Sequence, residues 1–174
     1  QNATSMFMNP DDGLRAVNSA TQIAQFEFAS CRTSDAIWKL IEHMKVGVIE
    51  TDLEKLFIGN GLPLSCHRMV SFGEKAKRGL ASPSENRAKS GDAFTAALGL
   101  WGSLTCRAGV VAASADDLPD TVREFYPRFV SNYFDVVTAW YESISIHAIA
   151  GDVYAAVEAR RDTSLFDFAV NPGH

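Results

Sequence analysis

The chain has 174 residues, 47% hydrophobic and 21% charged, and its formal net charge at pH 7 is −5. This length suffices for one domain with a substantial core, and an acidic chain lacks the basic stripe that nucleic-acid phosphates require. No apolar run approaches the roughly 18 residues of a membrane span, and no signal peptide opens the sequence. We therefore expect a soluble domain that binds neither nucleic acid nor membrane.

The three cysteines, Cys31, Cys66 and Cys106, are an odd number at wide and irregular spacings. This pattern is neither a disulfide framework nor a zinc motif, and it is typical of a reducing compartment. The sequence thus predicts a cytoplasmic protein with no cofactor. We expect Cys66 to be buried, its neighbour His67 to lie on the surface, and Cys106 to be a small core residue.

The first half of the chain predicts two helices after a polar lead-in, residues 1–12. Ser19 and Gln22 have the spacing of a capping box that starts a helix ending near Met44. A second capping box, Thr51 with Glu54, predicts a shorter helix that the Gly-Asn-Gly at 59–61 stops.

Strands follow, and then helices again. Residues 64–72 read as a strand, 73–91 as a polar loop and 91–109 as a hairpin. The range 118–146 keeps helical spacing, with Pro119 at its start and Pro127 expected to bend it, and 151–161 reads as a last helix. This order predicts an α+β domain in which helices cover one face of an antiparallel sheet.

The hairpin holds the first candidate site. If Gly102 and Ser103 form a two-residue turn, Ala97 faces Ala108 across the strands. Alternation then gives one face to Phe94, Leu98 and Leu100, which suit a core, and the other face to small residues: Thr95, Ala97, Gly99, Cys106, Ala108 and Val110. Small residues favour close packing of another segment, and a hollow that admits a ligand is the alternative.

The basic residues of the polar loop form a second candidate feature. We interpret them as a solvated surface, with a gate over a cavity for an anionic ligand as the alternative. They are Lys75, Lys77, Arg78, Arg87 and Lys89.

Four stretches together resemble the creatinase, prolidase and methionine aminopeptidase superfamily, which has the pita-bread fold. LRAVNSATQIAQFEFAS resembles its entry helix, VGVIETDLEKL its turn into the next helix, and AIAGDVYAAV the loop and helix before its closing Gly-His motif. The stretch from Gly91 to Gly109 is similar to its Gly-Asp strand and the strand that follows. The resemblance implies that residues 13–174 form a C-terminally incomplete pita-bread domain, a curved antiparallel sheet backed by helices.

The same resemblance implies where a metal site would lie. In metal-dependent members, two aspartates eleven residues apart, a Gly-His histidine and two later glutamates hold two metal ions. The aspartates fall on Ala97 and Ala108, the histidine falls on His174, and the glutamates lie beyond the end of this sequence. The substrate-handling histidine of the family falls near Gly79 or Leu80, and no histidine occurs there.

Methyl groups cannot coordinate a cation, and one imidazole is too few ligands for a catalytic zinc site. We therefore expect a catalytically degenerate metallopeptidase-like domain that binds a small molecule or peptide or acts as a scaffold, and that forms a homodimer. There are two alternatives. One is a metal-independent, creatinase-like hydrolase of a small amide or guanidino compound, and the other is an Xaa-Pro peptidase-type hydrolase. No catalytic residue is assigned; the binding-cavity candidates are Thr95, Ala97, Cys106, Ala108 and His174.

Overall fold

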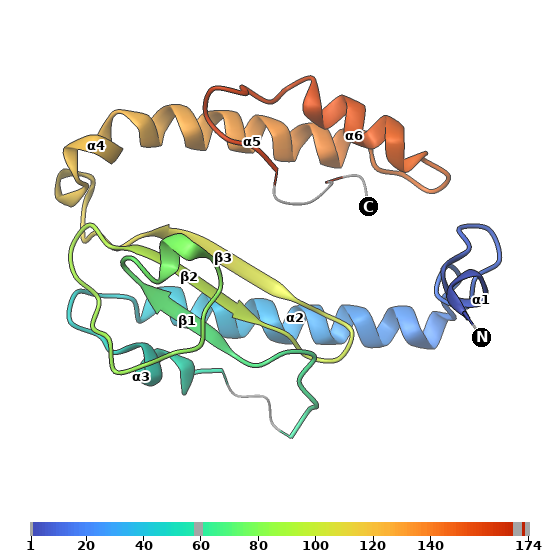
Figure 1. Cartoon of the computed structure of the whole chain (residues 1–174), viewed down its shortest axis with the longest axis horizontal. Coiled ribbons are helices and arrows are strands. Elements are labelled where there is room, and N and C mark those ends of the chain that lie inside the picture. The colour runs from blue at the N-terminus through green and yellow to red at the C-terminus, as the bar shows by residue number, and fades with distance from the viewer. Residues whose placement is uncertain (1, 58–60, 169–171, 173–174) are drawn as a thin grey trace. The chain divides into compact units, whose positions relative to one another are not determined.

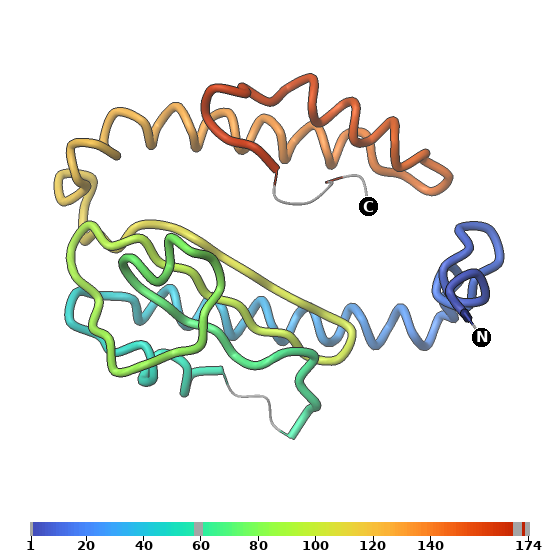
Figure 2. Tube along the Cα trace, viewed as in Figure 1, coloured from blue at the N-terminus to red at the C-terminus, as the bar shows by residue number. Residues whose placement is uncertain are grey.

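The computed structural model describes residues 2–57, 61–168 and 172 of the chain (Figures 1 and 2). The chain divides into two compact units, Gln1–Asp117 (unit 1) and Leu118–His174 (unit 2). Within the described ranges, no helix is both long and apolar enough to cross a membrane.

Unit 1 contains an antiparallel sheet of three strands in the order β1-β2-β3, with helices packed against it. The expected α+β architecture is therefore confirmed. Its elements are α1 Thr4–Met8, α2 Ala20–Glu42, α3 Glu50–Glu54, β1 Met69–Phe72, the 3-10 turn η1 Ala76–Arg78, β2 Ala93–Leu98, β3 Thr105–Val110 and the 3-10 turn η2 Ala115–Asp117. The lead-in is not uniformly loose, because it contains the short α1, whose residues are all exposed.

The N-terminus of α2 confirms the first capping box. The Ser19 hydroxyl accepts the Gln22 N–H at 3.3 Å, and the Gln22 side chain accepts the Ser19 N–H at 2.7 Å. These two bonds satisfy backbone donors that the first turn of a helix leaves unpaired. The buried face of α2 follows helical spacing, as expected: Ala29, Thr33, Ala36, Ile37 and Leu40.

The second expected capping box is wrong. Helix α3 begins at Glu50, after Ile49, and no side chain caps it. The reason is that the Thr51 hydroxyl donates instead to Glu85 at 3.0 Å, while the Glu50 carboxylate turns toward the sheet. Most of the Gly-Asn-Gly stop lies outside the described residues.

The expected hairpin register is also wrong, by two residues. Ala97 lies opposite Cys106, and Thr95 lies opposite Ala108. The turn is displaced by one residue: the Ser103 N–H donates to the Leu100 carbonyl at 2.8 Å, so Trp101 and Gly102 are the two central residues, and Gly102 takes the third turn position with φ +98°. Because side chains alternate with period two, a shift of two residues changes the partners but keeps the faces.

The core of unit 1 lies between one face of this sheet and helices α2 and α3. Phe94 and Leu98 pack there, as expected, together with Phe72 from β1 and Ile37 and Leu40 from α2. Burying each of the large side chains contributes about 1.5–3 kcal/mol. The opposite face of the sheet does not contribute to this core.

Unit 2 contains α4 Asp120–Arg123, α5 Phe125–Ser143 and α6 Ala150–Glu158. The helix expected over 118–146, with a bend at Pro127, is instead interrupted at Glu124, three residues upstream of that proline. Pro127 lacks an N–H and its ring opposes the carbonyl four residues earlier, that of Arg123, so the break falls before the proline. Helices α5 and α6 lie side by side and share the buried Val136, Val153 and Val157.

Candidate functional site

The small-residue face is the face of the sheet turned away from the core. Its two complete rows across β1, β2 and β3 are Met69, Ala97 and Cys106, and Ser71, Thr95 and Ala108. Four of the five sequence candidates thus share this face, although Ala97 and Ala108 are diagonal neighbours rather than directly opposed. His174 lies outside the described residues.

The small-residue face is covered over β1 and β2 and open over β3. Ala97 and Ser71 are 0% exposed, whereas Cys106 and Ala108 are exposed. Thr95 donates its hydroxyl to the Gly79 carbonyl at 3.2 Å, and the Ser71 and Thr95 hydroxyls lie 2.8 Å apart. The segment after η1 therefore lies against this face and pairs its polar groups.

The hairpin tip packs tightly against the chain that leads into β1. A Cβ placed on Gly99 would lie 2.2 Å from the Ser65 Oγ and 2.9 Å from the Cys66 Sγ, so a larger residue there would displace these side chains. Gly99 also accepts the Ser65 N–H at 3.0 Å. His67 is exposed, as expected, whereas Cys66 is half-buried and not fully buried as the sequence predicted.

The expectation that Cys106 is a core residue is wrong, because its side chain is exposed at the edge strand. Partial burial, and then the neighbouring Cys66, nevertheless raise the pKa of the Cys106 thiol, and Arg107 opposes this rise. A thiol with a raised pKa holds little thiolate at neutral pH, and the thiolate is the nucleophile. The geometry therefore does not support nucleophilic catalysis by Cys106.

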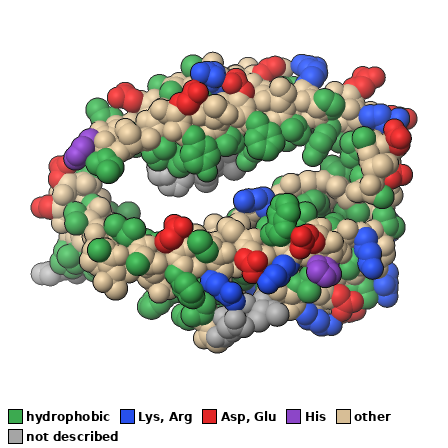
Figure 3. Space-filling view, turned by 180° about the vertical axis from the view of Figure 1, so that it is seen from behind, with side chains coloured by type: hydrophobic (Ala, Val, Ile, Leu, Met, Phe, Trp, Pro, Cys, Tyr) green, Lys and Arg blue, Asp and Glu red, His purple; other side chains and the backbone are tan. Residues whose placement is uncertain are grey.

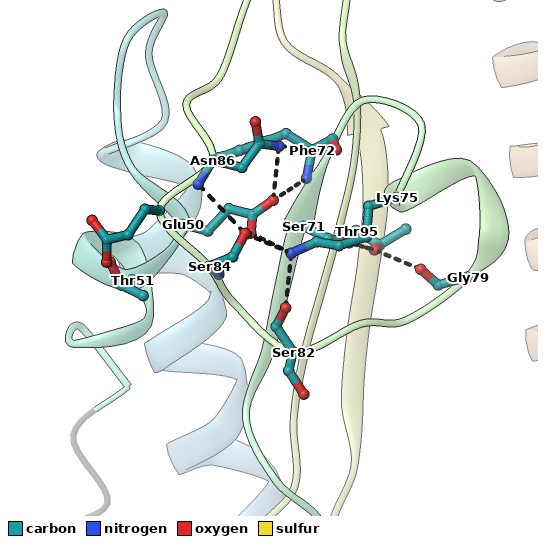
Figure 4. A network of polar contacts seen from close by, with 11 residues as sticks. Glu50, Thr51, Ser71, Phe72, Lys75, Gly79, Ser82, Ser84, Asn86 and Thr95 are labelled. Carbon is teal, nitrogen blue, oxygen red and sulfur yellow. Dashed lines mark hydrogen bonds and ion pairs between the residues drawn. The ribbon is translucent and has the colours of Figure 1, made fainter.

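The best-connected polar group of unit 1 is Glu50, which the sequence analysis missed (Figure 4). Its carboxylate is 0% exposed. Oε1 accepts the Phe72 N–H at 2.8 Å and the Asn86 amide at 3.2 Å. Oε2 accepts the Ser84 N–H at 2.8 Å, the Ser84 hydroxyl at 2.7 Å and the Lys75 ammonium at 2.5 Å. We call these five residues the Glu50 clamp.

The Glu50 clamp keeps its carboxylate charged. Burial alone raises the pKa of Glu50, but the bonds from Lys75, Ser84, the Phe72 N–H and Asn86 together outweigh it and lower the pKa below the ordinary 4.5. The clamp joins α3, the end of β1 and the polar loop. The sequence contains a signal for this buried carboxylate. Glu50 is the single charged residue between Lys45 and Asp52, and a charged residue in such an apolar run is buried only when it is paired.

The basic loop lines a small pocket of about 330 Å³ with Lys75, Lys77 and Lys89. Lys75 pairs with Glu50 and Lys77 with Glu74, and Asp92 also lines the pocket, so its charges largely cancel. The exposed positions of Lys77, Arg78, Arg87 and Lys89 confirm the solvated surface, whereas Lys75 is partly buried.

Among residues 2–57, 61–168 and 172, no three His, Cys, Asp or Glu side chains gather closely enough to hold a metal ion. The chemistry that remains on the small-residue face is that of methyl groups, two paired hydroxyls and one protonated thiol. Such a surface can contact a ligand, but it offers no general base.

Solved structures of several peptidases are similar to this chain. Dipeptidase PepE from Mycobacterium ulcerans superposes with a TM-score of 0.67 at 17% identity, over 91% of this chain and 42% of its own. Prolidase from Pyrococcus furiosus superposes with a TM-score of 0.65 at 19% identity, over 84% of this chain and 44% of its own. Xaa-Pro dipeptidase from Bacillus anthracis superposes with a TM-score of 0.65 at 18% identity, over 84% of this chain and 42% of its own.

The chain therefore spans less than half the length of these peptidases. No family model matches the sequence, and no curated protein matches it closely enough to count as a relative. At such low identity the likeness establishes the fold. The chain contains part of the pita-bread fold that the prolidases and Xaa-Pro dipeptidases have. The structural likeness confirms the resemblance that the sequence shows.

Proposed function

We propose that this chain is a catalytically degenerate metallopeptidase-like domain, which binds a peptide or small molecule and does not hydrolyse it with a dinuclear metal centre. One observation carries the proposal: Ala97 and Ala108 share the small-residue face, at the two positions where the resemblance places metal-binding aspartates. Neither methyl group can coordinate a cation.

The burial of Ala97 supports the same proposal. An ionised carboxylate at this 0% exposed position would need a cation or several donors to offset its desolvation. The polar groups nearby, the Ser71 and Thr95 hydroxyls, already bond to each other and to the Gly79 carbonyl. The face is thus internally satisfied without a metal ion.

The direct test is a peptidase assay with added metal. The purified chain is incubated with Mn²⁺ or Co²⁺ and an Xaa-Pro dipeptide, the substrate class in the names of the similar structures. We expect no hydrolysis above the rate of the metal ion alone, and no bound metal by elemental analysis. Metal-dependent turnover would contradict the proposal.

Two single variants provide a matched comparison. Ala97→Asp places a carboxylate at a buried position, and Ala108→Asp places one at an exposed position of the same face. We expect Ala97→Asp to lower the free energy of unfolding by about 3 kcal/mol, and Ala108→Asp to change it by less than about 0.5 kcal/mol. Equal losses would show that burial does not separate the two positions.

Ligand binding is tested with the same Xaa-Pro dipeptide as a probe. We expect the backbone resonances of Cys106 and Ala108 to shift in NMR spectra, because β3 carries the open part of the face. Shifts confined to unit 2, or no shifts at millimolar peptide, would remove the small-residue face from the proposal.

We also propose that the chain forms a homodimer in the cytoplasm. β3 is an edge strand of the described sheet, with Cys106, Arg107 and Ala108 exposed, and such an edge is a template for pairing with another chain. The cytoplasmic assignment is supported by the three cysteines, all of which are free thiols. Light scattering after size exclusion should give twice the chain mass of 19.0 kDa; a monomer would contradict the dimer.

A further inference from the structure

Two of the three thiols of unit 1 lie close to each other on one side of its sheet. Cys106 is an exposed residue of β3, and Cys66 is a half-buried residue of the chain that leads into β1. The third, Cys31, is an exposed residue of α2, which covers the opposite face of the sheet. Exposed hydrophobic side chains are scattered among charged ones on the surface of unit 1 (Figure 3), so apolar exposure marks no site there. The pair of thiols is the more specific feature.

A bulge in the pairing of β1 with β2 positions Cys66. The register changes between Leu64 and Met69, so that the four residues 65–68 lie opposite only residues 98 and 99. The extra residues leave the regular ladder, as bulge residues do, and a bulge redirects the side chains that it carries. The segment 65–68 is therefore irregular chain beside the sheet rather than part of a strand.

The side chains of this bulge cross β2 at Gly99. Gly99 follows Ala97 by two residues, so its missing Cβ belongs to the small-residue face. The Cys66 Sγ lies 2.9 Å from the place of that Cβ, in the space that the glycine leaves. The Ser65 hydroxyl passes over the same glycine and donates to the Ser103 carbonyl, beyond β2, at 3.1 Å. The Cys66 sulfur therefore lies over β2, on the small-residue face and on the way to β3.

Cys106 lies on that next strand, diagonally from Gly99. Its direct partner is Ala97, and diagonal neighbours across an antiparallel pair are about 7–8 Å apart. A sulfur above Gly99 is therefore within side-chain reach of Cys106. Cys66 is also the second cause, after partial burial, of the raised pKa of the Cys106 thiol, and a distant thiol would have no such effect. Only the irregular bulge has to adjust for the two sulfurs to meet at disulfide geometry.

We propose that Cys66 and Cys106 are a redox-sensitive pair, which forms an intramolecular disulfide with a small-molecule disulfide such as glutathione disulfide as the oxidant. The exposed Cys106 thiolate attacks one sulfur of glutathione disulfide, whose S–S bond breaks and releases a glutathione thiolate. The Cys66 thiolate then attacks the Cys106 sulfur of the mixed disulfide, and a second glutathione thiolate leaves. The two cysteines lose two electrons and two protons, and glutathione disulfide gains them to become two glutathione thiols.

The new bond lies across the small-residue face, next to Ala97 and over the part that is open at β3. Oxidation should therefore weaken the binding of a ligand to this face. That consequence rests on the proposed function, whereas formation of the bond does not, so the two proposals can fail separately.

The test compares oxidation of the full chain in native buffer and in urea. Cys66 lies 35 residues after Cys31 and 40 residues before Cys106, so the unfolded chain should form the two possible bonds of Cys66 in amounts equal within about a factor of two. In native buffer with millimolar glutathione disulfide, the bond to Cys106 should exceed the bond to Cys31 by roughly tenfold. Alkylation of the remaining thiols and peptide mass mapping measure both bonds.

Three variants provide controls. Cys31→Ser should keep the native disulfide, because α2 lies on the other side of the sheet. Cys66→Ser should leave Cys106 as a glutathione adduct, and Cys106→Ser should leave Cys66 without a bond to Cys31. The comparison of native buffer with urea uses the wild-type chain, so it stands even where a variant folds poorly.

Three results would each overturn the proposal. The first is the same ratio of the two Cys66 bonds in native buffer and in urea. The second is glutathione adducts on both Cys66 and Cys106 of the native chain with no bond between them. The third is a Cys106 disulfide between two chains in place of the bond within one chain.

Discussion

Removal of the Glu50 carboxylate should cost more stability than any other single polar change on the sheet of unit 1. In Glu50→Ala, the Phe72 N–H and the Ser84 N–H lose their acceptor, and the Lys75 ammonium loses its counter-charge. Removing one partner of a buried ion pair typically costs about 3–5 kcal/mol. Because a domain is stable by only about 5–15 kcal/mol in total, this loss is large.

Two companion variants separate charge from shape. Glu50→Gln keeps one carbonyl oxygen for the Phe72 N–H but turns an amide donor toward Ser84 and Lys75, so we expect a loss of about 2–4 kcal/mol. Glu74→Ala removes a carboxylate whose side chain is 78% exposed in its pair with Lys77, and no measurable loss is expected.

The assay is urea unfolding followed by circular dichroism and by tryptophan fluorescence, with coincident transitions as the test of two-state behaviour. The expected order of stability is wild type and Glu74→Ala, then Glu50→Gln, then Glu50→Ala. A loss below about 1 kcal/mol in Glu50→Ala would refute the reasoning, because hydration would then replace all five bonds without cost.

Three further predictions follow from the geometry. Because the pKa of Glu50 is lowered on folding, its contribution to stability is present above about pH 4.5 and is lost as the pH falls through the folded pKa. The urea unfolding midpoints of wild type and Glu50→Gln should therefore converge in acid. A difference between the two midpoints that stays constant with pH would contradict this. Gly99→Ala should cost about 1–3 kcal/mol because its Cβ meets the Ser65 Oγ, whereas Gly151→Ala, with open space around it, should cost nothing in the same urea assay. Cys106 should alkylate more slowly at pH 7.5 than free cysteine because its pKa is raised; peptide mass mapping checks this, and a rate equal to that of free cysteine would show that the thiol is not perturbed.

Local features of the fold were predictable from the sequence because local chemistry decides them. Ser19 and Gln22 cap α2 through contacts three residues apart, and alternation along β2 places Phe94 and Leu98 in the core. The hairpin register was not predictable in the same way. Contacts of Gly99 with Ser65, more than thirty residues earlier, help to set the hairpin tip, and a turn dipeptide does not encode them.

The sequence predicted that Thr95, Ala97, Cys106 and Ala108 share one face of the sheet, but it did not predict which of them are buried. Period-two alternation is insensitive to a two-residue shift, so Ala97 and Ala108 were assigned to one face even with the wrong partners. Their burial differs because a loop near Gly79 lies against β2 and leaves β3 open. Neither the loop's position nor the four partner residues of Glu50 follow from spacing along the chain.

The structure also indicates how the sheet is stable with alanines at positions 97 and 108. Two carboxylates on neighbouring strands repel each other and need a cation between them, whereas alanines impose no such requirement. The small-residue face pairs its remaining hydroxyls internally, and the Glu50 clamp fixes the polar loop from the far side of β1 without using that face. The elements that hold the fold are therefore separate from the positions that would perform catalysis. The sheet therefore needs no metal ion to be stable, and its face is open over β3, and both observations support the binding domain that we propose.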